Sequence, residues 1–296
     1  MDRQAHDFWQ ALAGELEAAG MNGRLGRPRP LGGGCIHAAA RVETGERALF
    51  VKRNGEALAP VFAAEAEGLE ALAAAGGVRV PRPLLHGIAG GQAYLVTELV
   101  ELHGSGDAGA FGAGLARMHA STAGAHGWHR DNWIGATVQA NGWYDDWAAF
   151  WRERRLGPQL ELAAHDGRGR LAERGQLLAE RVDTLLAGHA PAPSVLHGDL
   201  WAGNHGYDAH GRGCIFDPAA YYGDRETDLA MTELFGGYPP AFRAGYEAEW
   251  PLPEGHRVRA RLYNLYHVLN HAHLFGGGYA ASAERTIEGL LAECGA

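Results

Sequence analysis

The sequence is poor in lysine, in cysteine and in long apolar runs. Lys52 is the only lysine among 296 residues, whereas 25 residues are arginine. The three cysteines lie far apart and form no Cys-X-X-Cys pair, which argues against a disulfide framework or a cysteine zinc site and favours a reducing, cytoplasmic location. No apolar run approaches the roughly 18 residues of a membrane helix, and the N-terminus predicts an amphipathic helix rather than a signal peptide.

The charge distribution excludes further classes of partner. The formal net charge is -9, and acidic residues alternate with arginines without forming a basic stripe. This pattern argues against nucleic acid as a partner, and the lack of a long apolar run argues against a membrane. The chain has 16 histidines, of which His271 and His273 form the densest pair. Because no carboxylate accompanies that pair, we interpret it as part of a helix surface or core, with a metal site as the weaker alternative.

The first third of the sequence predicts a small β-sheet lobe. A strand is expected after the glycines of LGGGC, ETGE is a turn signal, and ALFVKR alternates into a second strand. A helix is expected over about Pro60–Ala75, with proline in its first turn, and 76–100 predicts another strand pair. The polar, glycine-rich stretch 101–109 indicates a lobe boundary. We therefore expect an N-lobe over residues 1–100.

From residue 101 onward, the pattern becomes mostly helical. The apolar groups that recur at helical spacing are Phe111/Leu115/Met118, Trp143/Trp147/Phe150, Leu178/Val182/Leu185 and Val258/Leu262/Leu265/Leu269. The stretch SVLHGDLWAGNHGYDAHGRGCIFDPA, residues 194–219, instead predicts a strand, a loop and a hairpin. We therefore expect a larger, helical C-lobe over residues 101–296.

The single lysine lies in a strand-like run and has a candidate partner. On the predicted helix, Glu65 falls three residues after Phe62 and four before Leu69, so its carboxylate shares their inward face. An inward carboxylate needs a counter-charge, and Lys52 is the obvious one. The alternative is that Glu65 reaches solvent at the lobe edge and Lys52 is a solvated strand residue.

A lysine among arginines suits a particular kind of contact. A compact ammonium group, unlike a planar guanidinium, makes a point contact to phosphate in a tight site. The glycines Gly32, Gly33 and Gly34 would let the backbone approach such a ligand closely, although most triple glycines are only turns. The motif is neither a Walker A sequence nor a dinucleotide-binding fingerprint, because a strand follows it.

LHGDLWAGN is the strongest signal in the chain. It places Asp199 five residues before Asn204 in a loop that we assign to 197–204, and CIFDP places Asp217 at the end of a strand. A kinase catalytic loop needs an Asp that accepts the proton of the substrate hydroxyl group and, five residues later, an Asn that binds a metal ion. It also needs an Asp at the end of a strand that binds Mg²⁺. Together with the upstream glycines, lysine and glutamate, this order predicts an α+β, bilobal protein-kinase-like fold that uses ATP and Mg²⁺.

LHGDLWAGN and FDPAAYYGDRETDLAM resemble the fructosamine-3-kinase (ketosamine-3-kinase) family, relatives of the aminoglycoside phosphotransferases. The resemblance covers nearly the whole chain, including GGGCIHAAA, LFVKRN, FAAEAEGLEAL and LNHAHLFGGGY. Its most family-specific part begins with DNWIGATVQANGW, and we assign 131–162 as a substrate segment. The sequence departs from the family pattern at Trp133, where Tyr is usual, and at Val138, where Pro is usual. Both changes bear on substrate preference.

The resemblance implies roles for individual residues. Lys52, braced by Glu65, would hold the α- and β-phosphates, and the backbone of the hinge formed by Thr97, Glu98 and Leu99 would meet adenine. The other implied roles are Asp199 as catalytic base, Asn204 and Asp217 as metal ligands, and His197 and Asp228 as braces of the catalytic loop. The reaction would phosphorylate the sugar 3-hydroxyl of a free or protein-bound ribulosamine, erythrulosamine or fructosamine. The unstable product would then release the amine, which is deglycation.

Three further residues carry weaker hypotheses. Trp201 could stack on the sugar or on its protonated amine, with loop packing as the alternative. Glu226 could pair with the amine, with a solvated helix face as the alternative. Cys35, in the glycine turn, could be an oxidisable thiol that links two N-lobes, so we expect a monomer or a redox-sensitive dimer; the alternative is a small turn residue.

Other functions stay open at this point. One is a phosphotransferase for another small hydroxyl compound, such as an aminoglycoside or choline. A second is a catalytically silent kinase fold that acts as a binding module, and a third is a metal hydrolase built from His197, Asp199 and Asp217.

Overall fold

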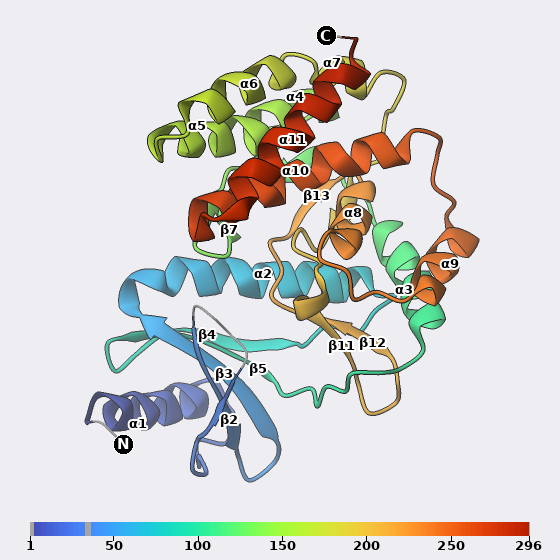
Figure 1. The fold of residues 1–296 in the computed structure, drawn as a ribbon. Coiled ribbons are helices and arrows are strands. Elements are labelled where there is room, and N and C mark those ends of the chain that lie inside the picture. Colours follow the sequence, from blue (N-terminus) through green and yellow to red (C-terminus); the bar gives the residue numbers. More distant parts are fainter. Residues whose placement is uncertain (1–2, 33–36, 296) are drawn as a thin grey trace.

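The computed structural model describes residues 3–32 and 37–295, and Figure 1 shows two parts joined by one connection. The N-terminal part is a five-stranded antiparallel sheet with the order β1-β2-β3-β5-β4. Its elements are α1 (Arg3–Ala18), β1 (Arg29–Leu31), β2 (Ala38–Glu43), β3 (Ala48–Gly55), the 3₁₀ turn η1 (Glu56–Leu58), α2 (Ala59–Ala75), β4 (Pro83–Ala89) and β5 (Gln92–Glu98). The predicted strands on either side of ETGE and the helix near Pro60 are confirmed.

The alternation of side chains along the strands decides which way Lys52 points. Tyr94 and Val96 of β5 pack with α1, whereas Ala93 and Leu95 pack with α2 on the other face. In β3, Val51 belongs to the α1 side, so its neighbour Lys52 lies on the α2 side. Period-2 geometry therefore delivers the ammonium group to the helix that carries Glu65.

The C-terminal part is mainly helical, as predicted. Its helices are α3 (Ala108–His119), α4 (Trp147–Phe150), the π-helical turn η2 (Trp151–Leu156), α5 (Gly157–His165), α6 (Gly169–Ala179), α7 (Val182–Leu185), the 3₁₀ turn η3 (Ala202–Asn204), α8 (Glu226–Leu234), α9 (Pro240–Glu249), α10 (His256–Phe275) and α11 (Gly278–Glu293). Its short strands are β6 (His126–Trp128), β7 (Asn132–Ile134), β8 (Thr137–Gln139), β9 (Gly142–Tyr144), β10 (Ser194–Leu196), β11 (His205–Tyr207), β12 (Gly213–Ile215) and β13 (Tyr221–Gly223).

Two details of the helical prediction are wrong. Trp143 does not share a helix face with Trp147, because it lies in strand β9 and is 50% exposed. Leu178 and Val182 do not share one helix either, because α6 ends at Ala179 and α7 begins at Val182. The strand, loop and hairpin expected over 194–219 are present as β10, η3, β11 and β12.

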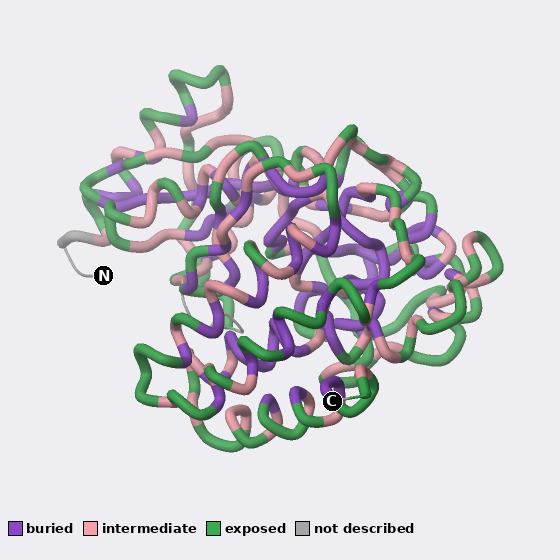
Figure 2. The backbone as a smooth tube through the Cα atoms, turned by 90° about the horizontal axis from the view of Figure 1, so that it is seen from above, coloured by how far each residue is buried: buried purple, intermediate pink, exposed green. Residues whose placement is uncertain are grey.

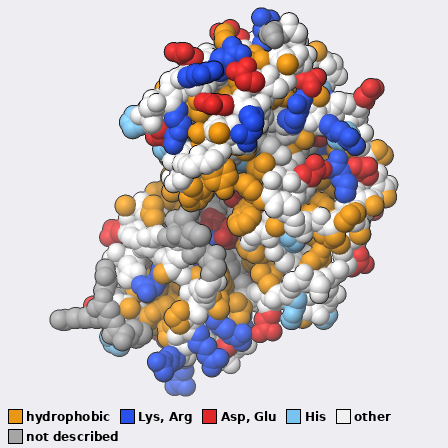
Figure 3. Space-filling model, viewed as in Figure 1, with side chains coloured by type: hydrophobic (Ala, Val, Ile, Leu, Met, Phe, Trp, Pro, Cys, Tyr) orange, Lys and Arg blue, Asp and Glu red, His pale blue; other side chains and the backbone are white. Residues whose placement is uncertain are grey.

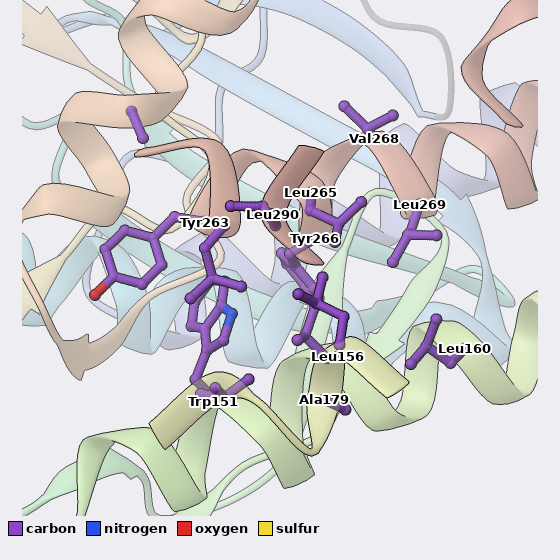
Figure 4. Close-up of a cluster of buried hydrophobic side chains, with 14 of the residues drawn as sticks. Trp151, Leu156, Leu160, Ala179, Tyr263, Leu265, Tyr266, Val268, Leu269 and Leu290 are labelled. Carbon is purple, nitrogen blue, oxygen red and sulfur yellow. The ribbon is translucent and has the colours of Figure 1, made fainter. Parts of the chain in front are cut away.

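The largest apolar cluster lies in the C-terminal part, where α10 and α11 pack over η2, α5 and α6. Figure 4 shows Trp151, Leu156 and Leu160 facing Tyr263, Tyr266 and Leu269 of α10. The buried stretches run through the middle of the molecule in Figure 2, and the outer helix faces and loops are exposed. Among the described residues, no helix is long and apolar enough to cross a membrane.

Helix α2 lies between the sheet and the C-terminal part in Figure 1, and it contacts both. Gly68 faces the segment after Asp217 so closely that a Cβ atom there would lie 3.2 Å from both Pro218 and Ala220. On the same helix, Glu67 lies 3.0 Å from Arg130 and 3.2 Å from His129 of the C-terminal part. The helix that carries Glu65 is therefore held from both sides.

Candidate active site

The ammonium group of Lys52 joins the two parts of the molecule. Its Nζ lies 2.7 Å from Glu65 Oε1 and 2.6 Å from Asp217 Oδ1. The predicted Lys52–Glu65 pair is thus present, and the solvated alternative is excluded because Lys52 is only 7% exposed. Burial alone would lower the pKa of Lys52, but the two carboxylates outweigh it and raise that pKa.

Asp199 and Asn204 face each other across the catalytic loop. Asn204 Nδ2 donates to the Asp199 backbone carbonyl at 2.9 Å and to its Oδ2 at 3.2 Å. Burial, followed by the nearby Asp217 carboxylate, raises the pKa of Asp199 to about 7, although the Asn204 hydrogen bond opposes the change. A carboxyl group with a pKa near neutrality can accept a proton from a hydroxyl group.

The His197 ring links this loop to the residue before Asp217. Its Nδ1 accepts from the Asp199 backbone N–H at 3.2 Å, and its Nε2 therefore donates to the Phe216 carbonyl at 2.9 Å. Burial lowers the pKa of His197, which keeps the ring neutral and suits one donor and one acceptor. The ring ties the residue before Asp217 to the loop that carries Asp199, in accord with the bracing role proposed for it.

Asp217 has an unusual backbone. Its φ is +58°, the one positive value for a non-glycine residue in 3–32 and 37–295. Asp tolerates this left-handed region better than most residues, and strain of this kind clusters at functional sites. The turn lets Oδ1 reach Lys52, and the Asp217 side chain stays 46% exposed.

Asp228 holds the start of the catalytic loop from α8. Its Oδ2 accepts from the His197 backbone N–H at 2.7 Å, and its Oδ1 accepts from the Gly198 N–H at 2.8 Å. Burial would raise the pKa of Asp228, but hydrogen bonds from His119 and from the backbone hold it below its usual range. His119, on α3, had no signal in the sequence.

The hinge residues lie at the end of β5. Thr97 is 4% exposed and donates through Oγ1 to the Glu98 carbonyl at 3.0 Å. The Glu98 carboxylate accepts from the Arg82 N–H at 2.8 Å and pairs with Arg79 at 2.7 Å, so its side chain serves the sheet. The side chains of Thr97 and Glu98 are thus engaged within the sheet, and contact of the backbone of Thr97, Glu98 and Leu99 with adenine stays a prediction.

Part of the predicted site lies outside the described residues. Gly33, Gly34 and Cys35 belong to the stretch 33–36, so the phosphate-cradle and thiol hypotheses stay predictions. Gly32 is described and exposed, directly after β1. The two described cysteines, Cys214 and Cys294, are both free thiols.

Of the two residues predicted to contact the substrate, Trp201 is exposed and Glu226 is buried. Trp201 is 40% exposed and covers Gly203, where a Cβ atom would lie 2.2 Å from the indole ring. Glu226 cannot pair with a substrate amine as hypothesised, because it is 3% exposed and makes bonds of 2.8 and 2.9 Å to Arg259. Nor does a solvated helix face describe it.

Glu226 also belongs to a group of close metal-ligand atoms, with His189 and Asp224. His189 Nε2 lies 2.6 Å from Asp224 Oδ2, and Arg259 occupies both oxygens of Glu226. The arginine neutralises one of the two carboxylates, and the other already has a hydrogen-bonded partner. The group is therefore explained as structural pairing.

A buried polar network anchors two residues of the predicted substrate segment to the stretch that follows Asp217. Asn132 donates to the Ala220 carbonyl at 2.8 Å, and Gln139 donates to the Ala219 carbonyl at 3.0 Å and accepts from Tyr266 at 2.9 Å. Sequence reasoning missed this role, because isolated Asn and Gln residues are also typical of turns. The β7–β8 hairpin thereby positions the backbone two and three residues after the metal candidate.

The donors present fit a magnesium–nucleotide complex. Asn204 uses its Nδ2 on Asp199, which turns Oδ1 away from that bond, and Asp217 uses one carboxylate oxygen on Lys52. The remaining oxygens are the hard donors that Mg²⁺ prefers beside phosphate. Figure 3 shows acidic side chains in the hollow between the two parts, with hydrophobic side chains along one edge.

The fold and the site define a protein-kinase-like phosphotransferase. The structure resembles an aminoglycoside phosphotransferase, APH(4)-Ia, solved in a ternary complex with ADP and hygromycin B, with a TM-score of 0.58 at 15% identity over 93% of this chain and 96% of that one. It is closer to a protein from Haemophilus somnus assigned as a fructosamine-3-kinase, with a TM-score of 0.88 at 27% identity over 98% and 100% of the two chains.

The family follows from the sequence comparisons. A family model described as fructosamine kinase matches residues 8–293, and the chain belongs to that family. A probable ketoamine kinase from Synechocystis is 44% identical over 96% of this chain and 97% of its own length. A chloroplastic protein-ribulosamine 3-kinase from Arabidopsis thaliana is 39% identical over 88% of this chain and 81% of its own length. The chain is thus an ATP-dependent kinase, as predicted.

Proposed function

We propose that this protein transfers the γ-phosphoryl group of ATP to the 3-hydroxyl group of a ketosamine, a sugar adduct of an amine, and thereby initiates deglycation. The observation that carries this proposal is the set of contacts that brings Lys52, Asp199, Asn204 and Asp217 together, within a chain that resembles ketoamine and ribulosamine kinases. The division into lobes near residue 100 and a cytoplasmic location belong to the same proposal.

The proposed roles are those that the family resemblance implies, and the surroundings of each side chain support them. Lys52, held between two carboxylates, contacts the α- and β-phosphates, and Asn204 and Asp217 would hold Mg²⁺. The bound metal ion supplies charge neutralisation at the phosphates. Asp199 orients the sugar hydroxyl group and accepts its proton, a task that suits a carboxyl group whose pKa is raised to about 7. Positioning and charge compensation supply most of the rate enhancement.

The acceptor approaches past Trp201. A row of aromatic rings continues from this residue: Phe235 lies 6.3 Å from Trp201, and His271 lies 4.9 Å from Phe235, measured between ring centroids. Trp201 and Phe235 are 40% and 39% exposed, which leaves ring faces for a sugar or for the protonated amine. We propose that Trp201 contacts the ketosamine. Glu226 has no part in this proposal, because Arg259 occupies its carboxylate.

The test is ATP-to-ADP turnover with Mg²⁺ on ribulose-, erythrulose- and fructose-derived lysine adducts, both free and in a peptide. We expect turnover on at least one adduct, phosphate at the sugar 3-position, and loss of turnover in Asp199→Ala with ATP binding retained. Trp201→Ala should raise KM for the adduct and leave KM for ATP unchanged. Turnover on an aminoglycoside or choline alone would refute the ketosamine proposal, and ATP binding without any turnover would favour a binding module.

A further inference from the structure

A chain of buried side chains runs from α9 to the catalytic loop. Arg225 Nη1 lies 3.2 Å from the Tyr246 hydroxyl oxygen, which lies 2.8 Å from His119 Nδ1. His119 Nε2 lies 3.2 Å from Asp228 Oδ2, the atom that also accepts the His197 backbone N–H. The residues of this chain are at most 7% exposed, and they come from α3, α9 and the start of α8.

The chemistry of the groups assigns the direction of every hydrogen bond. A guanidinium group only donates, so the Tyr246 oxygen accepts from Arg225. The hydroxyl hydrogen then needs an acceptor in this buried place, and the structure gives it His119 Nδ1. If Nδ1 carried the proton instead, the hydroxyl hydrogen would be left unpaired at an expense of about 1–3 kcal/mol. Nδ1 of His119 is therefore the acceptor, and Nε2 donates to Asp228.

We propose that Tyr246 and His119 are positioning residues for phosphoryl transfer: Tyr246 fixes the orientation of the His119 ring, and His119 thereby fixes the Asp228 carboxylate that holds the catalytic loop. The loop has little freedom of its own at this point. Gly198 has a φ of +80°, and a Cβ atom there would lie 2.1 Å from the Ala219 carbonyl oxygen. Rotation of the Asp228 carboxylate would release the amides of His197 and Gly198 and displace the adjacent Asp199.

The residues on either side of Arg225 show why this series of hydrogen bonds reaches the catalytic loop whereas the neighbouring ones do not. Asp224 and Glu226 flank Arg225 and are equally buried, but they pair with Tyr263 and Arg259 of α10. Only the Arg225–Tyr246–His119 branch ends on Asp228 and hence on the loop. Figure 1 shows α3, α8 and α9 together on the side of the molecule away from α5 and α6.

Two substitutions at position 119 separate positioning from packing. The amide nitrogen of glutamine can occupy the place of Nε2, whereas that of asparagine can occupy only the place of Nδ1. We expect His119→Gln to keep kcat within about 3-fold and His119→Asn to lose about 10–100-fold in kcat, the usual effect of removing an outer-shell partner. KM for ATP should stay unchanged in both variants, because Lys52 and the hinge are not touched.

Tyr246→Phe tests the part of this hydrogen-bonded series that lies farther from the catalytic loop. With the hydroxyl group gone, Nδ1 of His119 loses its donor, and the ring is free to turn its Nε2–H away from the Asp228 carboxylate. We expect kcat to fall about 10-fold or more, with KM for ATP unchanged. The control is Tyr263→Phe, which also removes a buried hydroxyl group with two partners, Asp224 at 2.7 Å and Trp147 at 2.9 Å. It should lower thermal stability similarly and keep kcat within about 3-fold.

A spectroscopic measurement tests this inference without any substrate, whereas the kcat measurements rest on the proposed function. In protein labelled with ¹⁵N-histidine, the His119 signals, assigned by their absence in His119→Gln, should show a protonated Nε2 and an acceptor Nδ1. In Tyr246→Phe, Nε2 should stay protonated beside the Asp228 carboxylate, and the Nδ1 signal should shift because Nδ1 loses its donor. Nδ1 protonated in the wild type, or equal losses of kcat in Tyr246→Phe and Tyr263→Phe, would overturn the inference. Absence of turnover on every adduct would refute the proposed function and leave the tautomer result valid.

Discussion

Lys52 Nζ lies 2.6 Å from Asp217 Oδ1, although the two residues are 165 positions apart in the chain. This contact, together with Glu65, closes a three-membered ionic group between the sheet and the C-terminal part. A lone ammonium group with 7% exposure would be strongly destabilised, so the two carboxylates and the lysine stabilise one another. The ionic group thus ties α2 to the segment that carries Asp217.

Lys52→Arg should inactivate the protein while leaving it folded. A planar guanidinium group cannot replace a compact ammonium between two carboxylates at 2.6 and 2.7 Å. We expect kcat/KM to fall about 10²–10³-fold, the effect of removing one well-placed cationic donor. The matched control is Arg53→Lys, one position on, where the side chain contacts Gln92 and the Phe8 ring and should tolerate the change. Unchanged kcat/KM in Lys52→Arg would refute the assigned role.

Arg155→Lys tests the opposite exchange. The Arg155 guanidinium is fully buried, lies 4.0 Å from the centre of the Tyr221 ring, and donates to the Ala140 carbonyl at 2.6 Å. Lysine can neither stack in this way nor reach both partners, so we expect a loss of about 2–4 kcal/mol in the free energy of unfolding. Urea unfolding measures this loss, and Arg174→Lys, at an exposed pair with Glu288, should be close to wild type. Equal stability of the two variants would contradict the prediction.

Gly68→Val should disturb the docking of α2. A Cβ atom at this position already lies 3.2 Å from Pro218 and Ala220, so the extra methyl groups of valine would push the helix away. We expect a loss of about 1–3 kcal/mol in the free energy of unfolding from overpacking, and a lower kcat because Glu65 moves with the helix. Gly14→Val, on α1 with no neighbouring atom within 4 Å of the added Cβ, is the control and should not lower kcat. If both variants keep wild-type kcat, close docking of α2 is unnecessary.

Protonation of His267 should destabilise the protein in mild acid. Burial, followed by repulsion from His271, lowers the pKa of His267 to about 3 in the folded state. In the unfolded chain the pKa is about 6.5, so between pH 6.5 and 3 the unfolded state binds a proton that the folded state does not. Stability that is fully present above pH 6.5 is therefore lost progressively as the pH falls toward 3, with a limiting slope of about 1.4 kcal/mol per pH unit.

The measurement is the free energy of unfolding in urea at pH 5, 6, 7 and 8. His267→Gln should flatten its pH dependence below pH 6.5, whereas His165→Gln, at a side chain that is 87% exposed, should keep the wild-type slope. A slope that is the same in wild type and His267→Gln would show that His267 does not contribute.

Local rules were sufficient for the parts of the site that lie close together in the sequence. Alternation along β3 and the helical spacing of Phe62, Glu65 and Leu69 are enough to bring Lys52 and Glu65 face to face, because both periods are properties of the backbone. The five-residue interval between Asp199 and Asn204 likewise fits one loop. These signals need no knowledge of distant contacts, and each of these residues lies where the sequence predicted.

The tertiary structure alone decided the partners of buried charges. Glu226 resembles a solvated residue in the first turn of a helix until Arg259, 33 residues later on α10, occupies both of its oxygens. His119 and Tyr246, 127 residues apart, meet only because α3 and α9 pack together. A carboxylate or an imidazole carries no sequence mark of whether its counterpart will be water, substrate or a distant side chain. That choice depends on which helices exclude water around the group, because desolvation decides whether a buried polar group must find a protein partner.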